Sequence, residues 1–409
     1  MSATTAGIAW RLQVPPPRGQ GLVLLPSRQY VQSKLPTAWA SRVGRTGAAQ
    51  PPSGGTPAPG QAPSGSSRSD VGEDSFAPWG DEFGDKPDGA FRVYCHNVNG
   101  LSLAGTGGDL AELCEIIRSK GIDVCGVVEH NLDQTQRSVL SACHNATRRV
   151  LHRAKLTLSG SATTMARWYK PGGVLQLTTG PSLGRIQSTT ADSMGRWAAQ
   201  TFRCRQGRSL TVITAYQVCK ATWSLLGQAT AAAQQISALR TGRHRSLDPR
   251  VHFKQDLEQY LKSLAVAGHS LILQGDFNET IGEPGSGIGA VASRVGLVDI
   301  MRQQHPTLAD PATYVRGTAR LDFVLATPDV AAAVRGAGYA SPFRYLHSDH
   351  RPIWLDLDAS ALFGAELPPL PAGLTANHTV CHVGKMASEF QMCYLGDTLM
   401  TSSSISDAI

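Results

Sequence analysis

Short apolar segments that border polar motifs dominate the middle of this chain. Residues 92–95, 124–128 and 270–274 are each rich in β-branched or bulky apolar side chains, which is typical of buried strands. The motifs that follow them are His96-Asn97-Val98-Asn99-Gly100, Glu129 and Gly275-Asp276-Phe277-Asn278, and a fourth, Ser348-Asp349-His350, precedes a further apolar segment at residues 353–355. Because packed α/β scaffolds present reactive groups at strand ends, these motifs predict a functional site there.

The polar motifs contain side chains that hard divalent cations prefer. Carboxylates and amides supply oxygen ligands, and Mg²⁺ is typically held by one or two carboxylates together with a substrate phosphate. His350 directly follows Asp349, and no serine or cysteine has the neighbouring base that activates a nucleophile. This combination favours metal-assisted attack of water on a phosphoester over acyl transfer.

The remaining pattern predicts alternating helices and strands. Apolar residues recur at helical spacing in residues 108–120 and 251–267, and a further helix is expected at about 222–240. Residues 172–177, 210–216 and 320–325 read as further strands, and residues 331–335 as a short helix or turn. The chain therefore predicts an α/β fold.

Charge is distributed unevenly along the chain. The formal net charge is +7, and residues 1–69 hold seven Arg or Lys and no Asp or Glu. Residues 111–255 hold 20 basic and 7 acidic residues. Within this basic stretch, Arg148, Arg149 and Arg153 are candidates for flanking the acidic site and binding a nucleic-acid backbone. A solvated face with no partner explains them equally well.

Composition also divides the chain into three parts. Residues 1–89 begin with a basic segment rich in Pro, Gly and Ser and end in an acidic one, and we predict a disordered leader because such a segment cannot bury enough apolar surface. Residues 90–358 hold the motifs. Residues 359–409 follow as a weakly ordered tail that contains the proline-rich segment Pro368-Pro369-Leu370-Pro371.

Several classes of protein are disfavoured. No apolar segment approaches the roughly 18 residues of a membrane span, so we expect no membrane partner. The eight cysteines show no C-x-x-C spacing, which gives no sign of a zinc site or a redox dithiol. We expect an intracellular protein, nuclear or cytoplasmic. The acid-free start, residues 1–45, also fits organelle targeting, and equally the basic leader of a mobile-element reading frame.

The order of the motifs resembles the endonuclease/exonuclease/phosphatase family, which includes AP endonucleases, DNase I and retrotransposon endonucleases. The residues that carry this resemblance are Asn97, Asn99, Glu129, Tyr216, Asp276, Asn278, Asp322, Asp349 and His350. The resemblance covers residues 90–358. It implies a four-layer α/β sandwich of the DNase I-like kind, in which two packed mixed β-sheets are flanked by helices.

The resemblance also implies roles for these residues. Residues implied to hold Mg²⁺, with Mn²⁺ as an alternative, are Glu129, Asn97, Asn99 and Asp349. Residues implied to be catalytic are Asp276, which handles the attacking water, Asn278 and Tyr216, which contact phosphate, and His350, which binds phosphate or transfers protons while Asp322 orients it. Simpler explanations stay open, because asparagines before Gly100 cap turns and Asp349 can do the same beside Ser348. His130 matches no catalytic position, and we expect it to be structural.

Within the family, the nearest resemblance is to retrotransposon-type endonucleases. Asn99 stands where AP endonucleases have aspartate, and the tryptophan that precedes Arg-Leu-Asp in those enzymes is absent before Arg320. We therefore expect a monomeric, Mg²⁺-dependent endonuclease that cleaves DNA and derives from a retroelement. The alternatives are an RNA deadenylase, a small-molecule phosphatase or phosphodiesterase of the same fold, and a non-catalytic remnant that binds nucleic acid.

Overall fold

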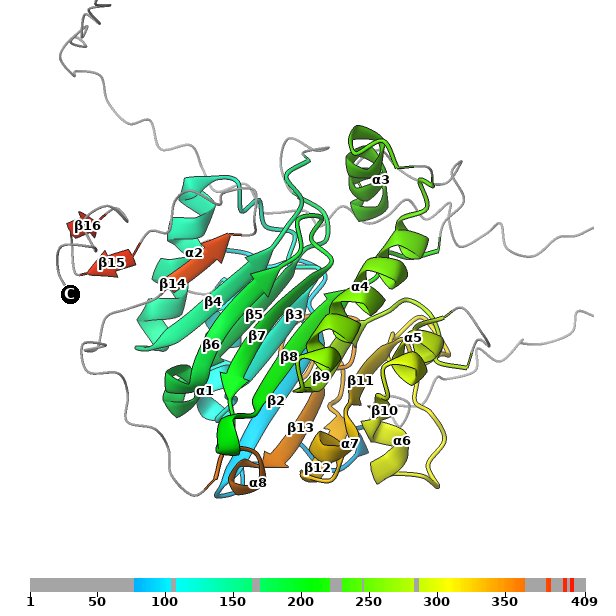
Figure 1. The fold of residues 1–409 in the computed structure, drawn as a ribbon. Coiled ribbons are helices and arrows are strands. Elements are labelled where there is room, and N and C mark those ends of the chain that lie inside the picture. Colours follow the sequence, from blue (N-terminus) through cyan, green and yellow to red (C-terminus); the bar gives the residue numbers. More distant parts are fainter. Residues whose placement is uncertain are drawn as a thin grey trace, which may run out of the picture. The chain divides into compact units, whose positions relative to one another are not determined.

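The computed structural model describes residues 77–103, 108–163, 170–220, 230–244, 246–282 and 287–364, and the backbone of three short strands between residues 380 and 400. In these residues two β-sheets pack face to face, and helices cover their outer faces (Figure 1). The predicted four-layer α/β sandwich with two mixed sheets is therefore confirmed.

The first sheet has the strand order β1-β12-β13-β2-β3-β5-β4-β14. Its strands are β1 (Trp79–Gly80), β2 (Ala90–Asn97), β3 (Val124–Val128), β4 (Ala154–Ser159), β5 (Val174–Thr179), β12 (Val334–Tyr339), β13 (Ile353–Asp358) and β14 (Val380–Val383). β2 and β3 are parallel, with Asn97 opposite Val128. The polar residues that end these two strands therefore lie at the same edge of the sheet.

The second sheet has the order β10-β11-β9-β8-β7-β6. Its strands are β6 (Ile186–Ala191), β7 (Trp197–Arg203), β8 (Ser209–Tyr216), β9 (His269–Asp276), β10 (Val298–Asp299) and β11 (Asp322–Ala326). β8 and β9 are parallel, with Tyr216 opposite Asp276, and β11 runs antiparallel to β9, with Asp322 opposite Asp276. A separate pair is formed by β15 (Cys393–Leu395) and β16 (Thr398–Met400).

The helices flank the two sheets. They are α1 (Asp109–Ser119), α2 (Arg137–Val150), α3 (Ala231–Thr241), α4 (Pro249–Val266), α5 (Ile288–Arg294), α6 (Ile300–Gln304), α7 (Pro328–Ala331) and α8 (Ala359–Phe363), with 3₁₀ turns at Gly180–Arg185 and Arg205–Gly207. The predicted helices at 108–120 and 251–267 are confirmed as α1 and α4. The helix expected at 222–240 is seen as α3, and residues 221–229 lie outside the described part of the chain.

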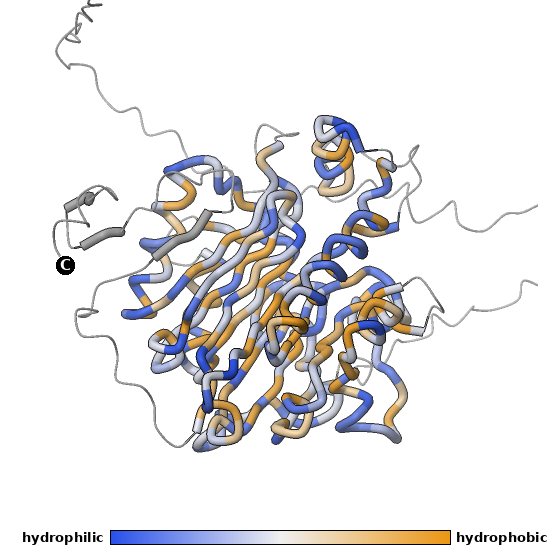
Figure 2. The backbone as a smooth tube through the Cα atoms, viewed as in Figure 1, coloured by the Kyte–Doolittle hydropathy of each residue, from blue (hydrophilic) through white to orange (hydrophobic). Residues whose placement is uncertain are grey.

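Alternation along the strands builds three apolar layers. Tyr94 of β2 faces a core shared with α1 and α2, whereas its neighbours Val93 and Cys95 face the core between the sheets. Ile213 of β8 faces a third core, which α4 and α5 cover. Figure 2 shows apolar residues along the strands of both sheets and hydrophilic residues on α4. The central strands of both sheets therefore bury both faces, as their predominantly apolar sequences indicate.

Part of the layer between the sheets is polar. The Gln200 side-chain amide of β7 donates to the Thr157 hydroxyl of β4 at 3.0 Å. The Gln274 amide of β9 donates to the Tyr94 carbonyl of β2 at 3.4 Å and, within its own sheet, to the Thr214 hydroxyl at 3.3 Å. Gly126 makes room for these groups, because a Cβ there would lie 2.3 Å from the Thr214 hydroxyl oxygen. Buried amides and hydroxyls that are paired in this way fix the register of one sheet on the other.

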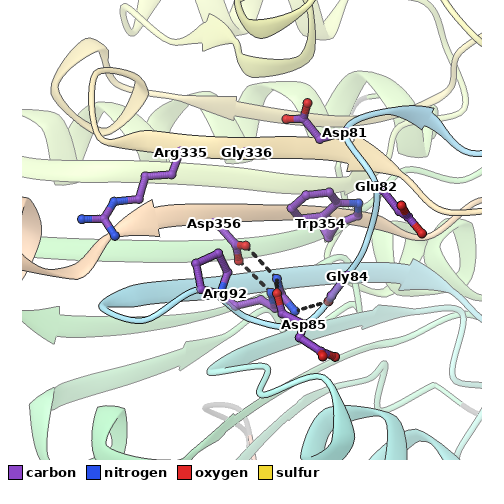
Figure 3. Close-up of a pocket in the computed structure, with 10 residues that line it drawn as sticks. Asp81, Glu82, Gly84, Asp85, Arg92, Arg335, Gly336, Trp354 and Asp356 are labelled. Atoms are coloured by element: carbon purple, nitrogen blue, oxygen red, sulfur yellow. Dashed lines mark hydrogen bonds and ion pairs between the residues drawn. The ribbon is translucent and has the colours of Figure 1, made fainter.

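The fold begins earlier than the predicted boundary at residue 90. Trp79 and Gly80 form β1 and pair with β12, and Phe83 is 3% exposed. The Arg92 guanidinium binds both carboxylate oxygens of Asp356 at 2.7 Å and also donates to the carbonyl of Gly84 at 2.9 Å. Figure 3 shows a pocket beside this ion pair, which is also lined by Asp81, Glu82, Gly84, Asp85 and Pro87. The prediction that all of residues 1–89 are disordered is therefore wrong for residues 77–89.

The fold also extends beyond the predicted end at residue 358. α8 follows β13 directly, and its residues Leu362 and Phe363 are buried in the core between the sheets. Asp358 caps α8 by accepting backbone hydrogen bonds from Ser360 and Ala361 at 2.8 and 3.0 Å. Among the described helices, none has both the length and the apolar character needed to cross a membrane.

Candidate active site

Five strands bring the predicted residues to one end of the sandwich. β2 and β3 end at Asn97 and just before Glu129, and β8 and β9 end at Tyr216 and Asp276. β11 starts there, at Asp322, because it runs in the opposite direction. His350 lies three residues before β13, whose residue Ile353 pairs with Cys95 near the end of β2. Residues from six distant parts of the sequence are thus gathered by strand direction alone.

Asn97 joins the two sheets at this end. Its side-chain nitrogen donates to Glu129 Oε1 at 3.1 Å and to Asp276 Oδ2 at 2.9 Å. Its amide oxygen accepts the backbone N–H of Asn99 at 3.0 Å. The residue therefore combines the two interpretations of its motif: it caps the turn before Gly100, and it holds two carboxylates of the site in place.

Glu129 is held in an unfavourable backbone conformation. Its φ is +56°, in the left-handed region that residues with a Cβ seldom adopt. Its carboxylate accepts hydrogen bonds from Asn97 and from the Tyr216 hydroxyl. Burial, and next the negative charge of Glu129, raise the pKa of Tyr216 far above its ordinary value. Tyr216 therefore stays a neutral donor that orients Glu129.

Asp276 and Asn278 form a compact turn after β9. The Asn278 backbone N–H donates to Asp276 Oδ1 at 2.9 Å, and the Asn278 side-chain nitrogen donates to the Gln217 carbonyl at 2.8 Å and to Asp276 Oδ2 at 3.2 Å. We expected this amide to donate to a substrate phosphate. The amide hydrogens are instead engaged within the protein, so Asn278 in this structure fixes the Asp276 carboxylate.

His350 is paired with Asp322 in the second sheet. Its Nδ1 lies 3.0 Å from Asp322 Oδ2. Burial alone would lower the pKa of His350, but the charge and hydrogen bond of Asp322, together with Asp276, raise it to about 10. At neutral pH the ring is therefore an imidazolium that donates through Nδ1 to Asp322. The predicted pairing of these two residues is present in the structure.

The charge balance of the site favours a cation. Burial raises the pKa of Asp276 well above its ordinary value, and the neighbouring carboxylate of Asp322 raises it further. Three carboxyl groups, those of Glu129, Asp276 and Asp322, face one imidazolium, so full ionisation of the site leaves an excess of negative charge that a cation would offset. Oxygen ligands with uncompensated negative charge are the donor set that Mg²⁺ or Mn²⁺ takes, and the residues present therefore fit such an ion.

The groups nearest to one another differ from the predicted metal ligands. Ligand atoms of Asp276, Asp322 and His350 all lie within 4.8 Å of one another. Of the four residues expected to hold metal, Glu129 contributes a carboxylate, Asn97 turns its nitrogen toward the carboxylates, and Asn99 is exposed and contributes its backbone N–H. Asp349 is half-buried, and its backbone carbonyl accepts from Val315 N at 2.9 Å.

Three residues of the site had no predicted role. Cys219 donates its thiol to the Asn278 amide oxygen at 3.1 Å, and Ser348 donates its hydroxyl to the Asn97 carbonyl at 2.5 Å. His96 binds the His350 carbonyl through Nε2 at 3.1 Å, and burial lowers the pKa of His96 to about 3, so it acts as a neutral donor. Ser348 and His96 belong to recognised motifs, and Cys219 lies three residues after Tyr216. Proximity to the motifs was the available signal.

His130 is structural, as expected. Its Nδ1 accepts the backbone N–H of Leu132 at 2.9 Å, and its Nε2 lies 3.3 Å from the Ser159 carbonyl oxygen. Burial lowers the pKa of His130 to about 4. The neutral ring thus ties the segment after β3 to the end of β4.

The three predicted nucleic-acid-binding arginines do not flank the site. Arg148 and Arg149 end α2, and Arg153 precedes β4. β4 pairs antiparallel with β5, so Ala154 lies opposite Thr179, which is near the start of β3, whereas Glu129 follows the end of β3. The expectation that these residues border the acidic groups is wrong, because two antiparallel pairings carry them to the other end of the sheet.

The site and fold together define a class of hydrolase: an α/β sandwich whose two sheets share one polar, carboxylate-rich end. Residues 95–350 match the model of the Endonuclease/Exonuclease/phosphatase family. The chain belongs to this family, as the order of its motifs predicted. Members of the family are hydrolytic nucleases and phosphatases.

Several solved structures resemble this chain, and those named below are all under 25% identical with TM-scores below 0.5. The AP endonuclease LMAP from Leishmania major is 16% identical, with a TM-score of 0.49, and the match covers 66% of this chain and 88% of that one. The 3′ phosphatase NExo from Neisseria, bound to a product DNA hairpin, is 20% identical with a TM-score of 0.44 and coverage of 66% and 100%. The human Nocturnin catalytic domain is 19% identical with a TM-score of 0.42 and coverage of 67% and 94%. No curated protein sequence matches this chain significantly.

Proposed function

We propose that this protein is a Mg²⁺-dependent endonuclease that hydrolyses phosphodiester bonds of DNA. The observation that carries the proposal is the gathering of Glu129, Asp276 and the Asp322–His350 pair at the shared end of both sheets. These groups provide a base, an acid and an excess of negative charge for a divalent cation. A bound cation would supply charge stabilisation for the phosphate and for the leaving oxygen.

In this proposal Asp276 accepts the proton of the attacking water. Its raised pKa brings its basicity closer to neutral pH, which is what a general base requires. Asn97 and Asn278 fix both of its oxygens, so the carboxylate is oriented before a substrate binds. Pre-orientation of a base contributes to the rate because no reorganisation is needed during the reaction.

His350 provides the positive charge on the other side of the site. Its imidazolium binds a phosphate oxygen or protonates the leaving oxygen through Nε2, while Asp322 holds Nδ1. The side-chain hydrogens of Asn97 and Asn278 are already engaged within the protein. Cationic groups therefore have to neutralise the phosphate, which is a reason to expect dependence on a metal ion.

Three substrates distinguish a DNA endonuclease from a deadenylase and from a phosphatase of the same fold. Purified full-length protein is incubated with supercoiled plasmid, polyadenylated RNA and phosphoinositides, each with MgCl₂ or with excess chelator. We expect nicking of the plasmid in MgCl₂ and intact RNA and phosphoinositides. Cleavage in excess chelator would contradict a metal mechanism, and turnover of RNA with intact plasmid would favour a deadenylase.

A pair of glutamate variants tests the site itself. Glu129→Gln should lower plasmid nicking by several orders of magnitude and leave the thermal midpoint close to that of the wild type, because the amide keeps the shape of the side chain. Glu115→Gln is the matched control, since Glu115 is a half-exposed residue of α1. Equal loss of nicking in both variants would show that the effect does not come from the site.

We further propose that the enzyme is of the retroelement type and cleaves undamaged DNA as a monomer. The sequence supports this proposal through Asn99, which stands where AP endonucleases carry aspartate. A duplex with one abasic site should then be cut no faster than an intact duplex of the same sequence. Preferential cleavage at the abasic site would instead assign the chain to DNA repair.

A further inference from the structure

Phe343 combines an exposed aromatic ring with a left-handed backbone. Its φ is +62°, and 49% of the residue is exposed. The left-handed conformation is unfavourable for residues with a Cβ, and burial of a half-exposed ring offsets this cost only in part. Residues held in such conformations gather at functional sites and ligand clamps. Phenylalanine at this position therefore adds little to the stability of the fold.

The loop that carries Phe343 is anchored at both ends. The Ala340 backbone N–H donates to the Pro352 carbonyl at 2.9 Å, and the Ser348 N–H donates to the Leu346 carbonyl at 2.8 Å. Between them, Leu346 is buried and Tyr345 packs edge-on against Phe83 at 5.3 Å between ring centroids. Phe343 is therefore displayed on a fixed support.

This loop leads directly into the candidate active site. Ser348 donates its hydroxyl to the Asn97 carbonyl, and His350 follows two residues later. The exposed ring of His347 lies 5.5 Å from the Phe343 ring at an interplanar angle of 81°. His347 and His350 are three positions apart in the sequence, so their Cα atoms are at most about 11 Å apart. Both exposed rings therefore stand close to the group that is proposed to bind phosphate.

A cation accompanies the two rings. Arg344 is exposed, and its guanidinium lies 5.7 Å from the centroid of the Tyr345 ring. Exposed aromatic rings beside an arginine are the features with which proteins hold unpaired nucleobases, because every base has a face that stacks and a phosphate that follows it. A base stacked here would belong to a nucleotide near the reacting phosphodiester.

We propose that Phe343 and His347 form a stacking platform for an unpaired nucleobase of the substrate, with Arg344 meeting an adjacent phosphate. The proposal rests on the proposed nuclease function and adds that one base next to the cleaved bond is unpaired while the substrate is bound. The ring of Phe343 contributes to binding, whereas its backbone conformation works against stability. Replacing Phe343 with glycine removes the ring and also relieves the backbone conformation, so a loss of binding and a gain of stability can be measured in the same variant.

The test compares Phe343→Gly with Gln206→Gly in the full chain. Gln206 is also exposed and left-handed, with φ of +57°, but it lies beside the start of β8, which pairs with the start of β9, whereas Asp276 ends β9. The probes are a single-stranded DNA oligonucleotide that contains 2-aminopurine and the fully paired duplex of the same sequence. Binding is measured in excess chelator by fluorescence titration, and thermal midpoints are recorded in parallel.

We expect Phe343→Gly to weaken binding of the single strand about tenfold and to abolish quenching of 2-aminopurine. Its affinity for the duplex should change less than twofold, and its thermal midpoint should stay equal or rise because glycine tolerates the backbone conformation. Gln206→Gly should leave both affinities unchanged. His347→Ala should weaken binding of the single strand in the same direction as Phe343→Gly.

Three results would overturn the platform. The first is equal affinity of Phe343→Gly and wild type for the single strand, and the second is a thermal midpoint several degrees lower in Phe343→Gly. The third is a wild-type dimer that this substitution dissociates, because a second copy of the chain would then cover the Phe343 ring. Failure of the nuclease proposal looks different. Wild-type protein would then quench the probe but cleave no nucleic acid in MgCl₂, and the platform would stand as a binding site.

Discussion

Replacing Phe83 with alanine tests whether residues before the predicted domain boundary are part of the fold. The Phe83 ring stacks against Tyr94 and Trp354 at centroid distances of 5.8 and 5.4 Å. The Arg92 guanidinium lies over the same ring, 5.0 Å from its centroid. Phe83 thus fills a space between β2, β13 and the segment that follows β1.

The magnitude follows from this burial. Truncation of a buried phenylalanine to alanine typically costs about 3–5 kcal/mol, and Phe83 is 3% exposed. We take about 3 kcal/mol, because the segment at residues 81–87 lies at the surface and can relax partly into the space. For a domain of this size about 2–4 °C corresponds to each kcal/mol, so the thermal midpoint should fall by about 6–12 °C.

The assay is thermal and urea unfolding followed by near-ultraviolet circular dichroism. Val266→Ala is the control, because Val266 is 90% exposed and its truncation should change the free energy of unfolding by less than about 0.5 kcal/mol. Removal of residues 1–76 should leave the midpoint nearly unchanged, whereas removal of residues 1–89 should lower it by more than Phe83→Ala does. A Phe83→Ala midpoint within about 2 °C of the wild type would refute this account of the N-terminal segment.

Three further predictions concern the site. Asp322→Asn should lower the pKa of His350, which is about 10 in the wild type, by several pH units, because the buried ring loses its main counter-charge. NMR titration of the His350 ring in excess chelator measures this pKa. An unchanged pKa would contradict the pairing of His350 with Asp322. Since this folded-state pKa lies above the ordinary 6.5, His350 stabilises the fold fully below about pH 6.5, and that stabilisation should fade as pH rises toward 10 in the wild type but not in His350→Gln. Cys219→Ala should lower kcat several-fold and leave KM unchanged, because the thiol only orients Asn278. Cys219→Ser, which keeps a donor at this position, should restore most of kcat. A rise in KM in Cys219→Ala would instead argue for direct contact of Cys219 with the substrate.

Much of the fold could be predicted because each central strand buries both faces. Residues 124–128 are apolar without a break, and residues 210–216 are interrupted only by Thr211 and Thr214; these segments form β3 and β8 as expected. β1 gives no such signal, since it has two residues and lies beside the acidic residues Asp81 and Glu82. Its stability comes from pairing with β12, about 260 positions later in the sequence, and a non-local contact of that kind leaves no local pattern.

The position of the site could be predicted from the sequence, but the hydrogen-bond partners of its side chains could not. Parallel neighbours end at the same edge, so residues that follow β2 and β3, or β8 and β9, must meet there. Which atoms pair depends on rotamers that strand periodicity does not determine. The engaged amide of Asn278 and the thiol of Cys219 are cases in which tertiary contacts decide the role.

The basic stretch at residues 111–255 shows why linear charge is a poor guide to a binding surface. Arg196 is buried and pairs with Asp192 and Asp256, and Arg250 pairs with Glu279, so these charges are neutralised within the fold. Arg148 and Arg149 stay exposed but lie at the far end of the first sheet. Among the described residues, Arg316 is an exposed charge in a loop beside the site: it lies near Tyr314, which is bridged to His350. It follows that the salt dependence of substrate binding should respond to neutralising Arg316 or Arg344 far more than to neutralising the arginines of α2.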